Sequence, residues 1–91
     1  MTALDSTVVF REKCLKYGLE ESDVTTLAGL GSSTFGSFAF SCAYVPGQPD
    51  ESMFLSSVVI PVLGTVDSPK ASILRRLFFE AYTMAAADLR W

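Results

Sequence analysis

The residues with the clearest chemical potential form a short glycine-containing segment, Leu-Ala-Gly-Leu-Gly-Ser-Ser-Thr, at positions 27–34. A glycine–apolar–glycine turn can direct backbone N–H groups at a phosphate, and the start of a following helix favours an anion. The candidates for such a phosphate hairpin are Gly29, Gly31, Ser32 and Ser33. No lysine or arginine lies within ten residues of this segment. A plain corner between two helices therefore accounts for the segment better than a phosphate site does.

Other reactive side chains form no catalytic pattern. The chain has no histidine, and so lacks the commonest near-neutral acid–base group and the commonest metal ligand. Its serines and threonines have no base beside them, which excludes a Ser-His-Asp arrangement. Cys14 and Cys42 lie on predicted apolar helix faces, and we expect buried structural thiols; a disulfide, a metal pair or a nucleophile are the alternatives. We predict no enzyme activity, no cofactor and no metal site.

Helix signals cover most of the chain. Capping residues precede apolar repeats with helical spacing, and glycine or proline follows them. The expected helices span about residues 6–17, 21–28, 32–44, 50–59 and 70–91. Pro61 predicts a kink or an end near Val59, because proline removes a backbone hydrogen bond and clashes with the preceding turn. The β-branched run 58–60 also fits a strand.

The last expected helix is apolar around most of its girth. One face carries Leu74, Leu77, Phe78, Ala81, Met84, Ala85 and Asp88. Phe78 and Phe79 point about 100° apart on a helix, so one core face cannot easily bury both. We therefore expect one of them to lie in an interface, and the candidates on the second face are Phe79, Tyr82 and Leu89. Arg75 and Arg76 either pair with acidic groups of a partner or form a solvated face.

Two family resemblances accompany these patterns. Residues 27–34 resemble the hairpin of helix-hairpin-helix modules, although bulky Phe35 stands where that family has a small residue. Residues 8–44 resemble SAM-type interaction domains in the order of their features: a helix, Tyr17-Gly18-Leu19, an acidic cap, Leu27, Gly31, and then a helix capped by serine or threonine. The loop at 46–49 and the lack of a tryptophan near the N-terminus depart from that pattern. The SAM resemblance implies a five-helix bundle, longest helix last, that binds other proteins or itself.

Composition and charge narrow the function classes. The 91 residues suit one small domain, and 49% are hydrophobic while 19% are charged, which excludes intrinsic disorder. Residues 17–69 contain six acidic residues and no lysine or arginine, so they repel nucleic acid. The longest apolar stretch, 53–66, is shorter than the about 20 residues of a membrane span. The N-terminus has no signal-peptide pattern, and we expect an intracellular, cytoplasmic protein without membrane contact.

The sequence thus predicts an all-α fold, a compact bundle of about five helices packed around a long C-terminal helix. We expect a single helical domain that is a fragment of a longer protein, because the chain stops inside its last helix. Eleven aromatic residues and an apolar last helix exceed what a thin core can bury, which favours a non-catalytic module for protein–protein interaction or self-assembly into a homo-oligomer. A helix-hairpin-helix-like module that binds nucleic acid is the alternative.

Nucleic acid is expected to bind weakly or not at all at physiological salt, because the acidic middle of the chain repels phosphate. If the hairpin at 29–31 does hold phosphate, binding should be independent of sequence and should fade as salt rises. Fluorescence anisotropy with labelled duplex and single-stranded oligonucleotides measures both. Tight binding that survives moderate salt would contradict this expectation.

Overall fold

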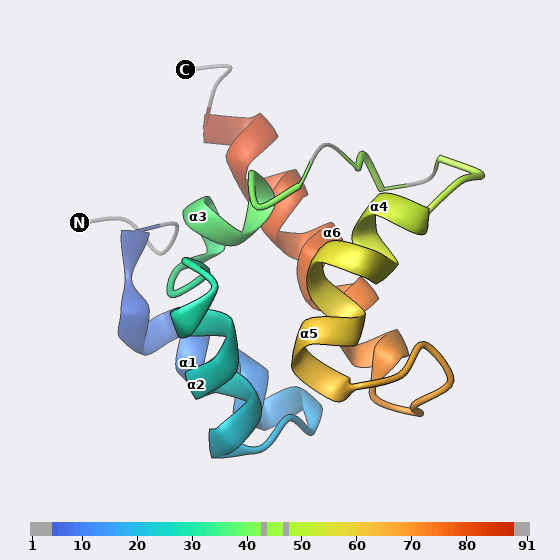
Figure 1. Cartoon of the computed structure of the whole chain (residues 1–91). Coiled ribbons are helices and arrows are strands. Elements are labelled where there is room, and N and C mark those ends of the chain that lie inside the picture. Colours follow the sequence, from blue (N-terminus) through green and yellow to red (C-terminus); the bar gives the residue numbers. More distant parts are fainter. Residues whose placement is uncertain (1–4, 43, 47, 89–91) are drawn as a thin grey trace.

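The chain folds into helices joined by turns and loops, as the computed structural model shows for residues 5–42, 44–46 and 48–88 (Figure 1). The elements are α1 Thr7–Tyr17, α2 Glu21–Gly29, α3 Phe35–Ala39, α4 Ser52–Phe54, the π-helical turn η2 Leu55–Val59, α5 Ile60–Leu63 and α6 Ala71–Asp88. Because α4, η2 and α5 follow one another without a break, they form one irregular helix, and the described residues make five helices. The predicted all-α fold with a long last helix is confirmed, and no strand occurs among these residues.

Local capping chemistry starts the helices close to where the sequence predicts. Ser6 Oγ accepts the Val9 N–H at 3.2 Å at the start of α1. At α3, the Thr34 hydroxyl accepts the Ser37 N–H at 3.1 Å, and the Ser37 hydroxyl oxygen accepts the Thr34 N–H. Such reciprocal bonds satisfy backbone donors that the first helical turn leaves unpaired. Asp50 likewise accepts the N–H of Ser52, the first residue of α4, at 3.0 Å.

Glycines in the left-handed region end α1 and α2 in the same way. The N–H groups of Gly18 and Leu19 donate to the carbonyls of Leu15 and Cys14, at 3.2 and 3.0 Å. This pair of bonds is the Schellman motif, which needs a positive φ at the first of the two donors. Gly18 has a φ of 114°, and Gly31 takes the same place after α2 with a φ of 93°.

One expected helix boundary is wrong, and so is one of the two alternatives at Pro61. The third helix ends at Ala39 instead of near residue 44, because the chain leaves the helix and brings Tyr44 against Phe54 and Phe78. For the fourth helix, the alternative of an end near Val59 is wrong, because the helix continues to Leu63 through an irregular turn at Leu55–Val59. In η2 the N–H of Ile60 donates to Leu55 O, a five-residue step. This wider turn directly before Pro61 accommodates the ring that a regular α-helix would exclude. Residues 58–60 are helical, so the strand alternative is also wrong.

Phenylalanine side chains from four helices form the centre of the core. The Phe10 ring lies 5.0 Å from Phe35 and 5.7 Å from Phe38, and Phe38 lies 5.3 Å from Phe78. Phe54 completes the series, 5.0 Å from Phe78. The rings meet edge to face or tilted, the arrangements that the aromatic quadrupole favours. They connect α1, α3, α4 and α6, so α6 packs centrally against the rest of the bundle (Figure 1).

Alanine substitutions at two glycines should change stability in opposite directions. Gly18→Ala forces an L-residue to a φ of 114°, and its Cβ would lie 3.1 Å from Ile73 Cδ1, so we expect a loss of about 1–2 kcal/mol. Gly29→Ala adds a methyl group into open space at a helical position, so we expect a gain of about 0.5–1 kcal/mol. Urea unfolding followed by circular dichroism measures both. Equal effects at the two positions would contradict the assigned helix ends.

Candidate interaction surface on helix α6

Helix α6 divides its apolar residues between the core and the surface. Its buried residues are Ala71, Leu74, Leu77, Phe78, Ala81 and Ala85. Phe78 is 1% exposed, whereas its neighbour Phe79 is 59% exposed. The expectation that one core face cannot bury both rings is confirmed, and Phe79 is the residue left outside. Phe79 is one of several large exposed apolar side chains, so its surroundings decide whether it forms a site.

Phe79 lines two shallow, mainly apolar hollows. The first, of about 310 Å³, lies toward α1 and is lined by Val9, Lys13, Phe35, Phe79, Glu80, Thr83 and Met84. The second, of about 300 Å³, is lined by Pro46, Phe79, Tyr82, Thr83, Ala86 and Ala87. Phe79 and Thr83 belong to both hollows. We call the residues of the second hollow the Phe79 surface.

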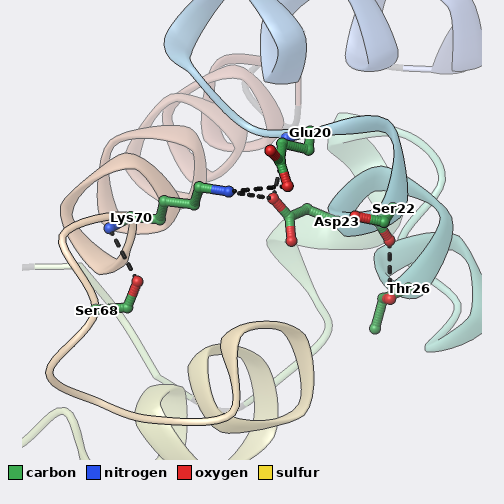
Figure 2. Close-up of polar contacts among 6 residues, drawn as sticks. All are labelled: Glu20, Ser22, Asp23, Thr26, Ser68 and Lys70. Atoms are coloured by element: carbon green, nitrogen blue, oxygen red, sulfur yellow. Dashed lines mark hydrogen bonds and ion pairs between the residues drawn. The ribbon is translucent and has the colours of Figure 1, made fainter.

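A buried carboxylate fixes the start of α6 against α2. Asp23 accepts the backbone N–H of Glu20 at 3.0 Å and the Lys70 ammonium at 3.2 Å, and Glu20 lies 3.4 Å from the same ammonium (Figure 2). Asp23 is 8% exposed, so both of its partners are needed to offset its desolvation. The two carboxylates raise the pKa of Lys70, chiefly through the hydrogen bond that its ammonium donates to Asp23. One side chain thus caps α2 and also anchors the segment that enters α6.

The two arginine candidates of α6 bind within the chain. The Arg75 guanidinium donates through Nη2 at 2.7 Å and through Nε at 3.1 Å to Glu51 Oε1. Arg76 lies over the Tyr17 ring, 4.1 Å from its centroid. The Tyr17 hydroxyl in turn donates to Glu80 at 2.6 Å. These contacts fix the rotation of α6 relative to α1 and α4. Both arginines are exposed, as the solvated-face alternative expected, but they also make contacts within the chain, which the sequence did not predict.

The candidate phosphate hairpin uses its donors elsewhere. Gly29 is the last residue of α2, and the N–H groups of Gly31 and Ser32 donate to Ala28 O and Leu27 O at 3.0 and 2.9 Å. Ser32 is buried and Ser33 is exposed. In this conformation the two central N–H groups close α2 and do not point to a free anion.

Neither cysteine is part of a reactive cluster in the described residues. Cys14 is fully buried, and desolvation raises its pKa to about 12, so it stays a thiol at neutral pH. Cys42 is half-buried and also free. No group of three metal-ligating side chains occurs in the part of the chain that the structure describes. Within the same part, no helix has the length and apolar character to cross a membrane.

The structure brings together only part of the predicted interface. Phe79 and Tyr82 lie on one surface, as expected from their spacing, whereas Leu89 lies outside the described residues. Ala86, which the sequence places on the same apolar side of the helix, also belongs to the surface, whereas Thr83 and Ala87 were not predicted. Spacing could have indicated them, because Thr83 and Ala87 follow Phe79 by four and eight positions on the helix. Pro46 carries no such signal, since only the fold brings its loop against α6.

Comparison with known proteins identifies no relative: no family model matches the chain, and neither a curated protein nor a solved structure matches it. The resemblance to SAM-type domains stays a prediction.

Removing Lys70 should destabilise the domain more than removing a surface cation. Lys70→Met leaves the buried Asp23 carboxylate without its ammonium partner, whereas Arg11→Met only breaks an exposed pair with Glu21. Double-mutant cycles with Asp23→Asn and Glu21→Gln should give the larger coupling for Lys70. Equal coupling in the two cycles would show that Asp23 does not depend on Lys70.

The ion pair of Lys70 with Asp23 should make the free energy of unfolding depend on pH. The pKa of Lys70 is higher in the folded protein than its ordinary value of 10.5, so its stabilisation is fully present below that value. The stabilisation is lost as pH rises through the folded pKa. The difference in unfolding free energy between wild type and Lys70→Met should therefore be constant near neutral pH and shrink above 10.5. A difference that grows in this alkaline range would contradict the assignment.

Proposed function

We propose that this domain is a non-catalytic module for protein interaction and assembly, and that the Phe79 surface is its contact site. The observation that carries the proposal is a largely exposed phenylalanine that lines two mainly apolar hollows, on the helix that forms the centre of the core. Aromatic side chains beside apolar pockets contribute most to protein interfaces.

The electrostatic setting supports the same function. Among the residues that the structure describes, no charged side chain lines the second hollow, so a partner can cover these residues without desolvating an ion. The nearest cations of α6, Arg75 and Arg76, contact Glu51 and Tyr17. A rigid helix with a preformed apolar surface loses little conformational entropy when it binds.

The two adjacent phenylalanines provide a matched test of stability. Phe78→Ala removes a buried ring that contacts three other rings, so we expect it to cost about 3–5 kcal/mol and to unfold a domain of this size. Phe79→Ser should cost about 1 kcal/mol or less, because the ring is mostly exposed. Thermal unfolding measured by circular dichroism separates the two. Similar losses would mean that Phe79 belongs to the core.

Binding is tested with Phe79→Ser and a control of equal exposure. Val8 on α1 is 61% exposed, close to the 59% of Phe79, so Val8→Ser removes a comparable apolar side chain far along the sequence from α6. The tagged wild type and both variants are expressed in cells that contain the protein, and co-purifying proteins, copies of the chain itself included, are quantified by mass spectrometry. We expect partners that wild type and Val8→Ser retain and Phe79→Ser loses. Identical partner sets for all three would contradict the proposed surface.

A further inference from the structure

The hollow of the Phe79 surface has the arrangement of a helix-packing hole. Its α6 residues Phe79, Tyr82, Thr83 and Ala86 stand at i, i+3, i+4 and i+7. These are the four positions that surround an inserted side chain when helices pack as knobs into holes. Ala86 and Ala87 provide small side chains on one side of the hole, and Pro46 borders it from a neighbouring loop.

The hole is large enough for an aromatic ring. Its volume is about 300 Å³, and a protein cavity of about 150 Å³ already accommodates benzene. A suitable ring stands on the same helix, because Phe79 projects beside the hole and is 59% exposed. Knob and hole therefore match in chemistry and in size, and both belong to one surface.

The order of the Phe79 ring and the hole along α6 determines how two copies can be oriented relative to each other. The centre of the hole lies about one helical turn after the knob, toward the C-terminus. If two copies packed with parallel α6 helices, one knob would fill one hole and leave an open end, which propagates into a filament. With antiparallel helices related by a two-fold axis, each Phe79 enters the hole of the other copy. Only the antiparallel arrangement places both Phe79 rings in holes and gives a closed dimer.

Charges permit this pairing. The described lining residues of the hole carry no charge, so these parts of two copies meet without like charges. The first hollow, which shares Phe79 and Thr83 with the hole, has Lys13 and Glu80 among its lining residues, one of each sign. A surface with both signs at its edge suits a second copy of itself, in which unlike charges can face each other, better than a strongly charged partner.

We propose that the Phe79 surface binds a second copy of this chain, forming a two-fold dimer in which antiparallel α6 helices exchange their Phe79 rings. This proposal rests on the proposed function and names its partner. Sedimentation of the whole chain should show a concentration-dependent dimer. Phe79→Ser removes two inserted rings per dimer and should raise the dissociation constant about a hundredfold or more, whereas Val8→Ser should leave it unchanged.

A cross-link tests the geometry. Thr83 lies beside the two-fold axis, while Ser72 is exposed on the same face, eleven residues or about 16 Å earlier along α6. In the antiparallel dimer the two Ser72 positions lie more than about 20 Å apart. Thr83→Cys and Ser72→Cys are compared in a Cys42→Ser background, where buried Cys14 stays unreactive. A short bis-maleimide should link Thr83→Cys into dimers and leave Ser72→Cys monomeric.

The outcomes separate this inference from the proposed function. A monomer at millimolar concentration, no cross-link at Thr83→Cys, or equal cross-linking at both positions would overturn the dimer. If partners other than the chain itself still depend on Phe79, the interaction surface stands and only self-pairing fails. If neither self-association nor binding to another protein depends on Phe79, the dimer and the proposed interaction surface are both wrong.

Discussion

The Phe78 ring is the contact on which the arrangement of the helices depends. It lies within 6 Å, centroid to centroid, of the rings of Phe38, Tyr44 and Phe54. Through these rings it connects α6 with α3, with the loop before α4, and with α4 itself. Each aromatic pair contributes about 0.5–1.5 kcal/mol beyond its buried area. A small domain has few other contacts of this size, so the rotation of α6 is fixed by where Phe78 must lie.

That constraint determines the surface. Once Phe78 points into the core, the next residue points about 100° away, and Phe79 reaches solvent. Polar contacts then prevent α6 from rotating to bury it. Lys70 is tied to Asp23 at the start of the helix, and Tyr17 donates to Glu80 in its middle. The exposed ring and the hole beside it are therefore consequences of the core packing.

Much of this fold could be predicted from sequence because its signals are local. Caps such as Ser6 and Thr34, and the left-handed Gly18, act within one turn and are readable from adjacent residues. The helix boundaries that were predicted wrongly depend on features that adjacent residues do not reveal. The end of α3 depends on the contact of Tyr44 with Phe54 and Phe78. The helix continues past Pro61 because of a widened turn, and no single residue in the sequence predicts that turn.

The candidate site was predictable to a similar degree. The split between Phe78 and Phe79 follows from helix geometry alone, and so does the position of Tyr82 near Phe79. The ion pairs of Lys70 and Arg75 were not predictable, because their partners Asp23 and Glu51 lie 47 and 24 residues away. The same holds for Pro46, whose loop reaches α6 only in the folded chain. Sequence periodicity gives the faces of a helix but not the side chains that approach them.

The division of α6 between core and interface is tested most directly by fluorine NMR of the chain labelled with 4-fluorophenylalanine. Spectra are compared in H₂O and D₂O at low and high protein concentration. We expect no solvent isotope shift at Phe78 at any concentration, because this ring is buried. Phe79 should show the shift in dilute solution and lose it on concentration, while Phe40, which is 67% exposed, keeps it throughout. A shift at Phe78, or a Phe79 already shielded in dilute solution, would contradict the division of α6 between core and interface.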